Sequence, residues 1–239
     1  MTVTGRYLRA LALLAAIALL SSCATNSYRP GTACTTAGFS ITDNFEGARR
    51  GQCRVLSDDQ VAIEITPESS GYINDSPWYA FKVEPNGADI ARITVRYFGG
   101  HHRYWPKISG DGLTWYAMED RYVRAADDRL TADIVVPLDG KPVWVSAHEL
   151  ITTGIYDAWG KKLARTSGFS PEVLGSSKGG LPIHVFDTND AGRELLFLVG
   201  RQHPPEVSGA FAFFAFAETI LGDGELAQRF RERFRIVAI

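Results

Sequence analysis

The sequence has little net charge and few cysteines. Its 239 residues include 25 Lys and Arg against 27 Asp and Glu, for a formal net charge of −2. This balance gives no reason to expect nucleic acid or an acidic surface as a partner. Internal repeats and low-complexity segments are also absent. Hydrophobic content of 45% and charged content of 22% are ordinary for a globular chain, and the length allows one large or two small domains.

The apolar run near the start, Ala10–Leu20, is too short to cross a bilayer as a helix. It follows two basic residues, Arg6 and Arg9, and small residues come directly after it. This order is typical of a secretory signal peptide rather than of a membrane helix.

The tetrapeptide that ends at Cys23, Leu-Ser-Ser-Cys, resembles a bacterial lipobox. The resemblance implies a signal peptide at 1–22, cleavage before Cys23 and lipid on its sulfur; an ordinary signal peptide with a chance cysteine is the alternative. Several acyl chains would hold the protein on a membrane surface without spanning it. Because Ala24, and not Asp, follows Cys23, we expect an exported lipoprotein of the bacterial cell envelope, in the outer membrane if the host is Gram-negative.

Two cysteines, Cys34 and Cys53, remain if Cys23 carries lipid. In an oxidising compartment two such cysteines can pair. Both lie in an early segment with little apolar content, where a cross-link would help most. We expect a Cys34–Cys53 disulfide, with two free thiols as the alternative.

The middle of the chain has the pattern of β-structure. A linker at 23–38, rich in Ser, Thr, Gly and Pro, precedes it. Short β-branched and aromatic runs then alternate with Gly, Asn, Asp and Pro turns. These runs are Val61–Ile65, Trp78–Val83, Ala91–Phe98, Leu113–Met118, Leu130–Val136 and Val143–Ser146. Their spacing, without a helical stretch between them, predicts an antiparallel β-sandwich domain at 39–147.

Near His148 the pattern changes to alternating helices and strands. Apolar residues recur every four positions from Ile151 to Leu163, which predicts a helix over Glu149–Arg165. The expected elements after it are a strand pair (Val173–Ser176 and Leu181–Phe186), an apolar strand (Glu194–Val199), a helix apolar nearly all round (Glu206–Leu221), an amphipathic helix (Glu225–Phe234) and a buried strand (Arg235–Ile239). The helix that is apolar all round should be buried on more than one side.

A polar turn, Gly200–Pro205, separates the apolar strand from that helix and contains the motif His203-x-x-Glu206. An imidazole and a carboxylate three residues apart on one tight turn can both reach a zinc ion. In an open α/β sheet this turn would lie in the crevice at the carboxyl ends of the strands, where ligands bind. The spacing alone is equally compatible with a turn in which Glu206 faces the positive end of a helix dipole.

The remaining histidines favour structural roles. His101 and His102 are adjacent, and adjacent residues of a strand point to opposite faces, so they rarely share a metal. His148 fits a helix cap or an interdomain contact, and His184 a packed or edge position in a strand. The aromatic loop Tyr104–Lys107 could stack on a sugar, but we expect it to be a turn that packs on the domain interface.

Three segments, in order, resemble the zinc carboxypeptidases of the M14 type, especially their cytosolic-carboxypeptidase-like branch. The first, Leu174–Ile183, is similar to a Gly-x-Ser-x-x-Gly-Arg-x-Ile hairpin of that family, but has Gly180 in place of Arg. The second, Gly200–Phe213, is similar to the family's first zinc-ligand motif. The third, Phe234–Ile239, is similar to the strand before a Pro-x-x-Asn-Pro-Asp-Gly loop. The resemblance covers about 149–239, and the aromatic-rich region before it resembles the β-domain that precedes the catalytic domain in that branch. It implies an α+β two-domain protein, in which a β-sandwich is followed by the first part of an α/β zinc-carboxypeptidase domain at 148–239.

The resemblance assigns His203 and Glu206 as the first two zinc ligands. In that family the metal activates a water molecule, a separate Glu is the general base, and Arg residues anchor the substrate carboxylate. The third ligand, a second His, would lie beyond Ile239, as would the base and the anchors. We therefore expect this chain alone to be inactive and to bind Zn²⁺ weakly.

Three hypotheses follow. The first is an exported lipoprotein related to metallocarboxypeptidases, acting on peptide C-termini or cell-wall peptides and incomplete in this chain. The second is an envelope β-sandwich lipoprotein that binds a glycan or a partner and carries a vestigial peptidase segment. The third is a structural envelope lipoprotein in which the His-x-x-Glu motif is a coincidence. The motif order favours the first.

Overall fold

The computed structural model describes residues 31–67 and 77–239, and shows three β-sheets and three α-helices in that part of the chain. The expected signal peptide at 1–22, Cys23 and the rest of the linker up to residue 30 lie outside the described residues. The described part of the expected linker, 31–38, contains a short strand at Cys34–Thr35, so the β-structure begins earlier than predicted. Within the described ranges, no helix is both long and apolar enough to span a bilayer.

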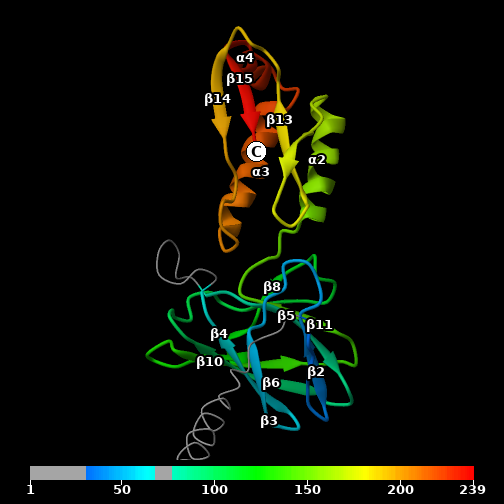
Figure 1. Ribbon diagram of the computed structural model, residues 1–239, viewed down its shortest axis with the longest axis vertical. Coiled ribbons are helices and arrows are strands. Elements are labelled where there is room, and N and C mark those ends of the chain that lie inside the picture. The colour runs from blue at the N-terminus through cyan, green and yellow to red at the C-terminus, as the bar shows by residue number, and fades with distance from the viewer. Residues whose placement is uncertain (1–30, 68–76) are drawn as a thin grey trace, which may run out of the picture.

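Two sheets form the first half of the chain, in the lower part of Figure 1. One has the strand order β1 (Cys34–Thr35), β2 (Phe39–Thr42), β5 (Ala80–Pro85), β11 (Val143–Ser146), β7 (Lys107–Ser109), β8 (Tyr116–Ala117). The other has the order β3 (Gln52–Ser57), β4 (Gln60–Ile65), β6 (Ile90–Tyr97), β10 (Thr131–Pro137), β9 (Val123–Ala125), with a 3-10 turn at Asp120–Tyr122.

Alternating side chains from the two sheets share one hydrophobic core. In β6 every second residue is buried, and Ile93 and Val95 are fully enclosed. Ile41 and Val83 of the first sheet and Ile63 of the second belong to the same cluster. The β-pattern of the sequence therefore arises because each strand turns one face to this core and the other to solvent.

One strand pair departs from the antiparallel arrangement that the sequence predicts. β4 and β6 pair in parallel, from Gln60 opposite Arg92 to Ile65 opposite Tyr97. The reason lies in the connection: between them the chain crosses to the other sheet as β5, so β6 returns in the direction of β4. All other pairs among the described strands of these two sheets are antiparallel.

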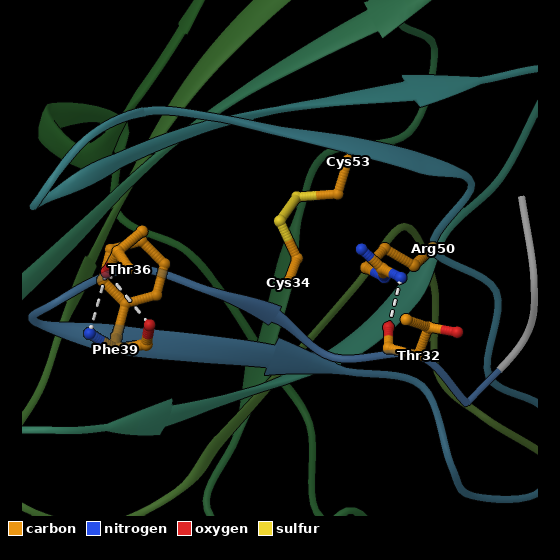
Figure 2. The surroundings of a disulfide bond; sticks show 6 residues. All are labelled: Thr32, Cys34, Thr36, Phe39, Arg50 and Cys53. Atoms are coloured by element: carbon orange, nitrogen blue, oxygen red, sulfur yellow. Dashed lines mark hydrogen bonds between the residues drawn. A yellow bond between two sulfur atoms is a disulfide. The ribbon is translucent and has the colours of Figure 1, made fainter. Parts of the chain in front are cut away.

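A disulfide joins the two sheets at their edges. Cys34 of β1 and Cys53 of β3, which the sequence analysis expects to pair, are bonded to each other (Figure 2). Beside them, the Arg50 guanidinium donates a 2.6 Å hydrogen bond to the Thr32 carbonyl. The cross-link thus holds the start of the described chain against the second sheet.

The second half of the chain forms a four-stranded sheet with helices packed against it, in the upper part of Figure 1. The strand order is β12 (Glu172–Ser176), β13 (Pro182–Asp187), β15 (Phe234–Ala238), β14 (Glu194–Leu198), and the helices are α2 (Thr153–Ser167), α3 (Val207–Leu221) and α4 (Glu225–Arg233). Trp159 of α2 is the centre of the packing, because its ring lies 4.5 Å from that of Phe214 and 5.5 Å from that of Phe186.

Helix α2 begins four residues later than the apolar spacing predicts. The Thr152 side chain accepts a hydrogen bond from the Ile155 amide, and Glu46 accepts one of 2.7 Å from the Thr153 amide. These two oxygens satisfy amides of the first helical turn, which fixes the start at Thr153. Residues 148–152 therefore form an extended connection between the two halves of the structure (Figure 1), and the division into domains remains a prediction.

Helix α3 is buried on one side only. Ala210, Phe214 and Leu221 are buried, whereas Phe211 and Phe216 are 48% and 46% exposed. The expectation of burial on more than one side is therefore wrong for the described residues. Leu195 and Phe197 of strand β14 are also exposed, at 62% and 54%.

Replacement of both disulfide cysteines tests the role of the cross-link. The bond closes a segment with a sequence separation of 19, for which chain entropy predicts a contribution of about 3 kcal/mol. We expect Cys34→Ser/Cys53→Ser to lower the free energy of unfolding in urea by roughly that amount. Reduction of the unaltered protein should have the same effect, and equal stability of the oxidised and reduced forms would contradict the prediction.

An ion pair at the end of β13 predicts a pH dependence. The Arg235 guanidinium donates to both carboxylate oxygens of Asp187, at 2.9 and 2.5 Å, and holds the pKa of Asp187 below its usual value. A lowered folded-state pKa stabilises the fold fully above the unfolded pKa of about 3.9, and this contribution is lost as the pH falls through the folded value. We expect Asp187→Asn to cost about 1–2 kcal/mol at neutral pH and clearly less at pH 3, as measured by urea unfolding. The same cost at both values would contradict this account.

Candidate metal-binding site

The turn that carries His203 and Glu206 is placed by parallel strand pairing. β14 runs parallel to β15. The pairing extends beyond the strand ends, where the Gly200 amide donates a hydrogen bond of 2.8 Å to the Ile239 carbonyl. The chain must then reverse to enter α3. Figure 1 shows this reversal at the end of the upper part that faces the two lower sheets. The turn thus lies at the carboxyl edge of the two strands, where sites in α/β sheets form.

His203 and Glu206 face each other across this turn. His203 Nδ1 lies 2.6 Å from Glu206 Oε1, and the His203 amide donates to Oε2 at 3.1 Å. The hydrogen bond from the His203 side chain is the largest cause of the lowered pKa of Glu206. Both side chains are accessible, at 38% and 43% exposure. One imidazole nitrogen and two carboxylate oxygens therefore converge on a place that solvent can reach.

The backbone of the turn explains why three-residue spacing brings the two side chains together. The Glu206 amide donates to the His203 carbonyl at 3.1 Å, and the Ala210 amide donates to the Glu206 carbonyl at 3.2 Å. Glu206 is the N-cap of α3, but its side chain makes no capping hydrogen bond to the helix. The Glu206 carboxylate instead pairs with the amide and the ring nitrogen of His203, although it also lies at the positive end of the helix dipole.

The turn has a hollow on each side. A cavity of about 710 Å³ is lined by His203 and, deeper in, by the aromatic side chains of Tyr156, Trp159 and Phe186. A second hollow of about 760 Å³ is lined by Glu206 together with side chains of α3 and of the two-sheet half. His203 thus lines the first hollow and Glu206 the second.

The other histidines lie apart from this turn and have structural surroundings. His102 is buried, with Nδ1 2.9 Å from the Tyr97 hydroxyl, and burial lowers its pKa. His148 packs between Trp78 and Tyr104, and burial lowers its pKa as well. Both roles are structural, but they differ from those expected: His102 is buried and not solvated in a turn, and His148 packs on rings of the two-sheet half while Thr152 caps α2.

His184 Nε2 lies 2.9 Å from Asp157 Oδ1, and both residues line the 710 Å³ cavity. In the aromatic loop, Tyr104 packs against the core and the Trp105 ring nitrogen donates to the Met118 carbonyl. The Trp105 side chain is nevertheless 42% exposed.

The chemistry of the paired donors fits part of a metal site. Zinc in catalytic sites is bound by three protein ligands and one water molecule, with nitrogen and oxygen donors such as these. Within residues 31–67 and 77–239, no three His, Cys, Asp or Glu side chains lie together so that they could hold a metal ion. The described residues thus contribute two donors, His203 and Glu206, and no catalytic step through a metal follows from them alone.

Solved structures with a similar fold are metallo-carboxypeptidases. One, a protein from Shewanella denitrificans assigned as carboxypeptidase A, has a TM-score of 0.67 at 17% identity, with 83% of this chain and 54% of that chain covered. A metallo-carboxypeptidase from Burkholderia cenocepacia has a TM-score of 0.65 at 16% identity, with 84% and 55% covered. Another, from Pseudomonas aeruginosa and in complex with (2-guanidinoethylmercapto)succinic acid, has a TM-score of 0.61 at 20% identity, with 83% and 54% covered.

The chain therefore has the fold of a metallo-carboxypeptidase over about half the length of these proteins. No protein-family model matches the sequence, and no curated protein is significantly similar to it. At identities of 16–20% the likeness establishes the fold, and the activity of this chain is a separate question.

A pair of glycines tests the close packing of the turn. A Cβ at Gly200 would lie 3.0 Å from Phe213 Cγ, whereas a Cβ at Gly209, in the first turn of α3, would meet nothing within 4 Å. We expect Gly200→Ala to destabilise the protein by about 1–3 kcal/mol through overpacking, and Gly209→Ala to stabilise it by about 0.5–1 kcal/mol. Thermal and urea unfolding of both variants measure this, and a neutral Gly200→Ala would contradict the tight packing.

Proposed function

We propose that this protein is a metal-binding carboxypeptidase-like lipoprotein of the cell envelope, in which His203 and Glu206 are the first two protein ligands of a Zn²⁺ ion. The observation that supports this most directly is the 2.6 Å approach of His203 Nδ1 to Glu206 Oε1, at the carboxyl edge of a sheet with a metallo-carboxypeptidase fold. The reaction class is hydrolysis of a peptide bond near a C-terminus, with peptides or cell-wall peptides as substrates.

When bound, the metal would lower the pKa of a water molecule and polarise a carbonyl. The chain's own contribution to that chemistry is geometric. The hydrogen bond from the Glu206 amide to the His203 carbonyl closes the turn. The parallel strands fix the position of the turn beside the two hollows. A third protein ligand, a general base and the carboxylate anchors are proposed to come from outside the described residues.

The envelope location rests on the lipobox-like sequence before Cys23, and the disulfide is consistent with export to an oxidising compartment. A protein held at a membrane surface by lipid would meet peptides of the envelope. An envelope β-sandwich binding lipoprotein with a vestigial peptidase segment is the rival function. In the aromatic loop that would serve it, Tyr104 packs on the core and Trp105 is 42% exposed.

Titration with Co²⁺ and Zn²⁺ tests the metal site. We expect weak, reversible binding by the unaltered protein, because two ligands on one turn provide few bonds to the ion. His203→Ala should weaken binding by at least about tenfold, or 1.4 kcal/mol. His101→Ala is the matched control, since His101 is exposed and lies in the two-sheet half, and it should bind like the unaltered protein.

Calorimetry gives the affinity, and the visible spectrum of bound Co²⁺ reports its ligands. Equal binding by the unaltered protein and His203→Ala would remove the proposed metal role and favour the binding-protein alternative. Tight stoichiometric Zn²⁺ binding would show that the chain supplies a third ligand, contrary to the two-donor site.

A further inference from the structure

Arg201, two residues before His203, connects the metal-binding turn to the other half of the molecule. Its Nε and Nη2 donate to the Pro204 carbonyl at 3.2 and 2.6 Å, and its Nη1 donates to the Ile151 carbonyl at 2.6 Å. The two accepting residues are 53 positions apart in the sequence, as their numbers show. A planar guanidinium offers its donors in a fixed fork, so it sets the relative position of two acceptors that bond to different arms.

Each of the two carbonyls belongs to a segment with its own fixed place. Pro204 lies inside the motif, between His203 and Glu206. Ile151 is 8% exposed and packs against Val207 at the start of α3. Leu150, directly before Ile151, is part of the core of the two-sheet half. The Ile151 carbonyl is therefore anchored from both sides, and it can serve as a fixed point for the turn.

His203 and Glu206 are held to each other by local hydrogen bonds, but these bonds do not fix the turn relative to the rest of the protein. The Arg201 fork supplies that restraint from the side of the 710 Å³ cavity, which Arg201, His203 and Ile151 line together. A ligand set that is already in place needs less reordering when a metal binds, and supporting residues of this kind commonly change metal affinity.

We propose that Arg201 is a positioning residue of the metal site: it clamps the Pro204 carbonyl to the Ile151 carbonyl and so holds His203 and Glu206 in a metal-ready arrangement. This inference rests on the proposed metal-binding function. It adds that the connection between the two halves, residues 148–152, is a structural part of the site. No local pattern in the sequence indicates this role, because the second acceptor of Arg201 is distant in the chain.

Arg201→Lys keeps the positive charge but loses the fork, since a single ammonium cannot reproduce three donations to two separated carbonyls. The matched control is Arg231→Lys. Arg231 Nη1 also bridges two carbonyls, those of Ile220 (2.6 Å) and Gly222 (2.8 Å), but they lie at the end of α3 away from the metal-binding turn. Both variants should lose some unfolding free energy in urea, which measures the purely structural part of each clamp.

Co²⁺ affinity and the visible spectrum of bound Co²⁺ then separate positioning from stability. We expect Arg201→Lys to raise the dissociation constant about tenfold and to change the spectrum, and Arg231→Lys to change neither beyond about twofold. If Arg201→Lys binds Co²⁺ like the unaltered protein while His203→Ala does not, the positioning role is wrong and the metal site stands. If His203→Ala has no effect either, the proposed function itself fails.

A measurement on the unaltered protein covers the case in which Arg201→Lys does not fold. Amide hydrogen exchange of 200–207 should show similar protection with and without Zn²⁺, because the clamp orders the turn before the metal arrives. A turn whose amides become protected only after Zn²⁺ is added would overturn the proposal.

Discussion

The parallel pairing of β14 with β15 is the constraint on which the candidate site depends. It aligns Glu194–Leu198 with Phe234–Ala238 and continues through the hydrogen bond from the Gly200 amide to the Ile239 carbonyl. Two parallel strands place their carboxyl ends at one edge, so the chain that leaves β14 has to turn there before α3 can pack on the sheet. The position of His203 and Glu206, the two hollows beside them and the contact with residues 148–152 all follow from that single pairing.

Features that depend on neighbouring residues could be predicted from the sequence. The His203–Glu206 pair is one, because three-residue spacing on a tight turn brings the side chains together whatever surrounds them. The bounds of α3 and α4 are another, since Gly222 and Gly224 separate two apolar patterns. Strands with a clear alternation of buried residues, such as β6 and β10, could be located for the same reason, whereas β1, β2, β3, β7 and β9 were not among the predicted strands.

Features that depend on distant residues could not be predicted. The acceptor of Arg201 at Ile151 and the parallel pairing of β4 with β6 are set by tertiary packing and leave no local pattern. The exposed face of α3 is a similar case: Phe211 and Phe216 look like core residues in the sequence, and only the structure shows that nothing in the described chain covers them.

The most direct test of the account is X-ray absorption at the zinc edge of the Zn²⁺-loaded protein, which reports the atoms bound to the metal. Two ligands on one turn predict one imidazole nitrogen at about 2.0–2.1 Å, together with oxygen from Glu206 and water. Loss of the imidazole signal in His203→Ala would assign the nitrogen. A shell of several imidazoles, of sulfur, or of oxygen alone would contradict the claim that His203 and Glu206 form the metal site.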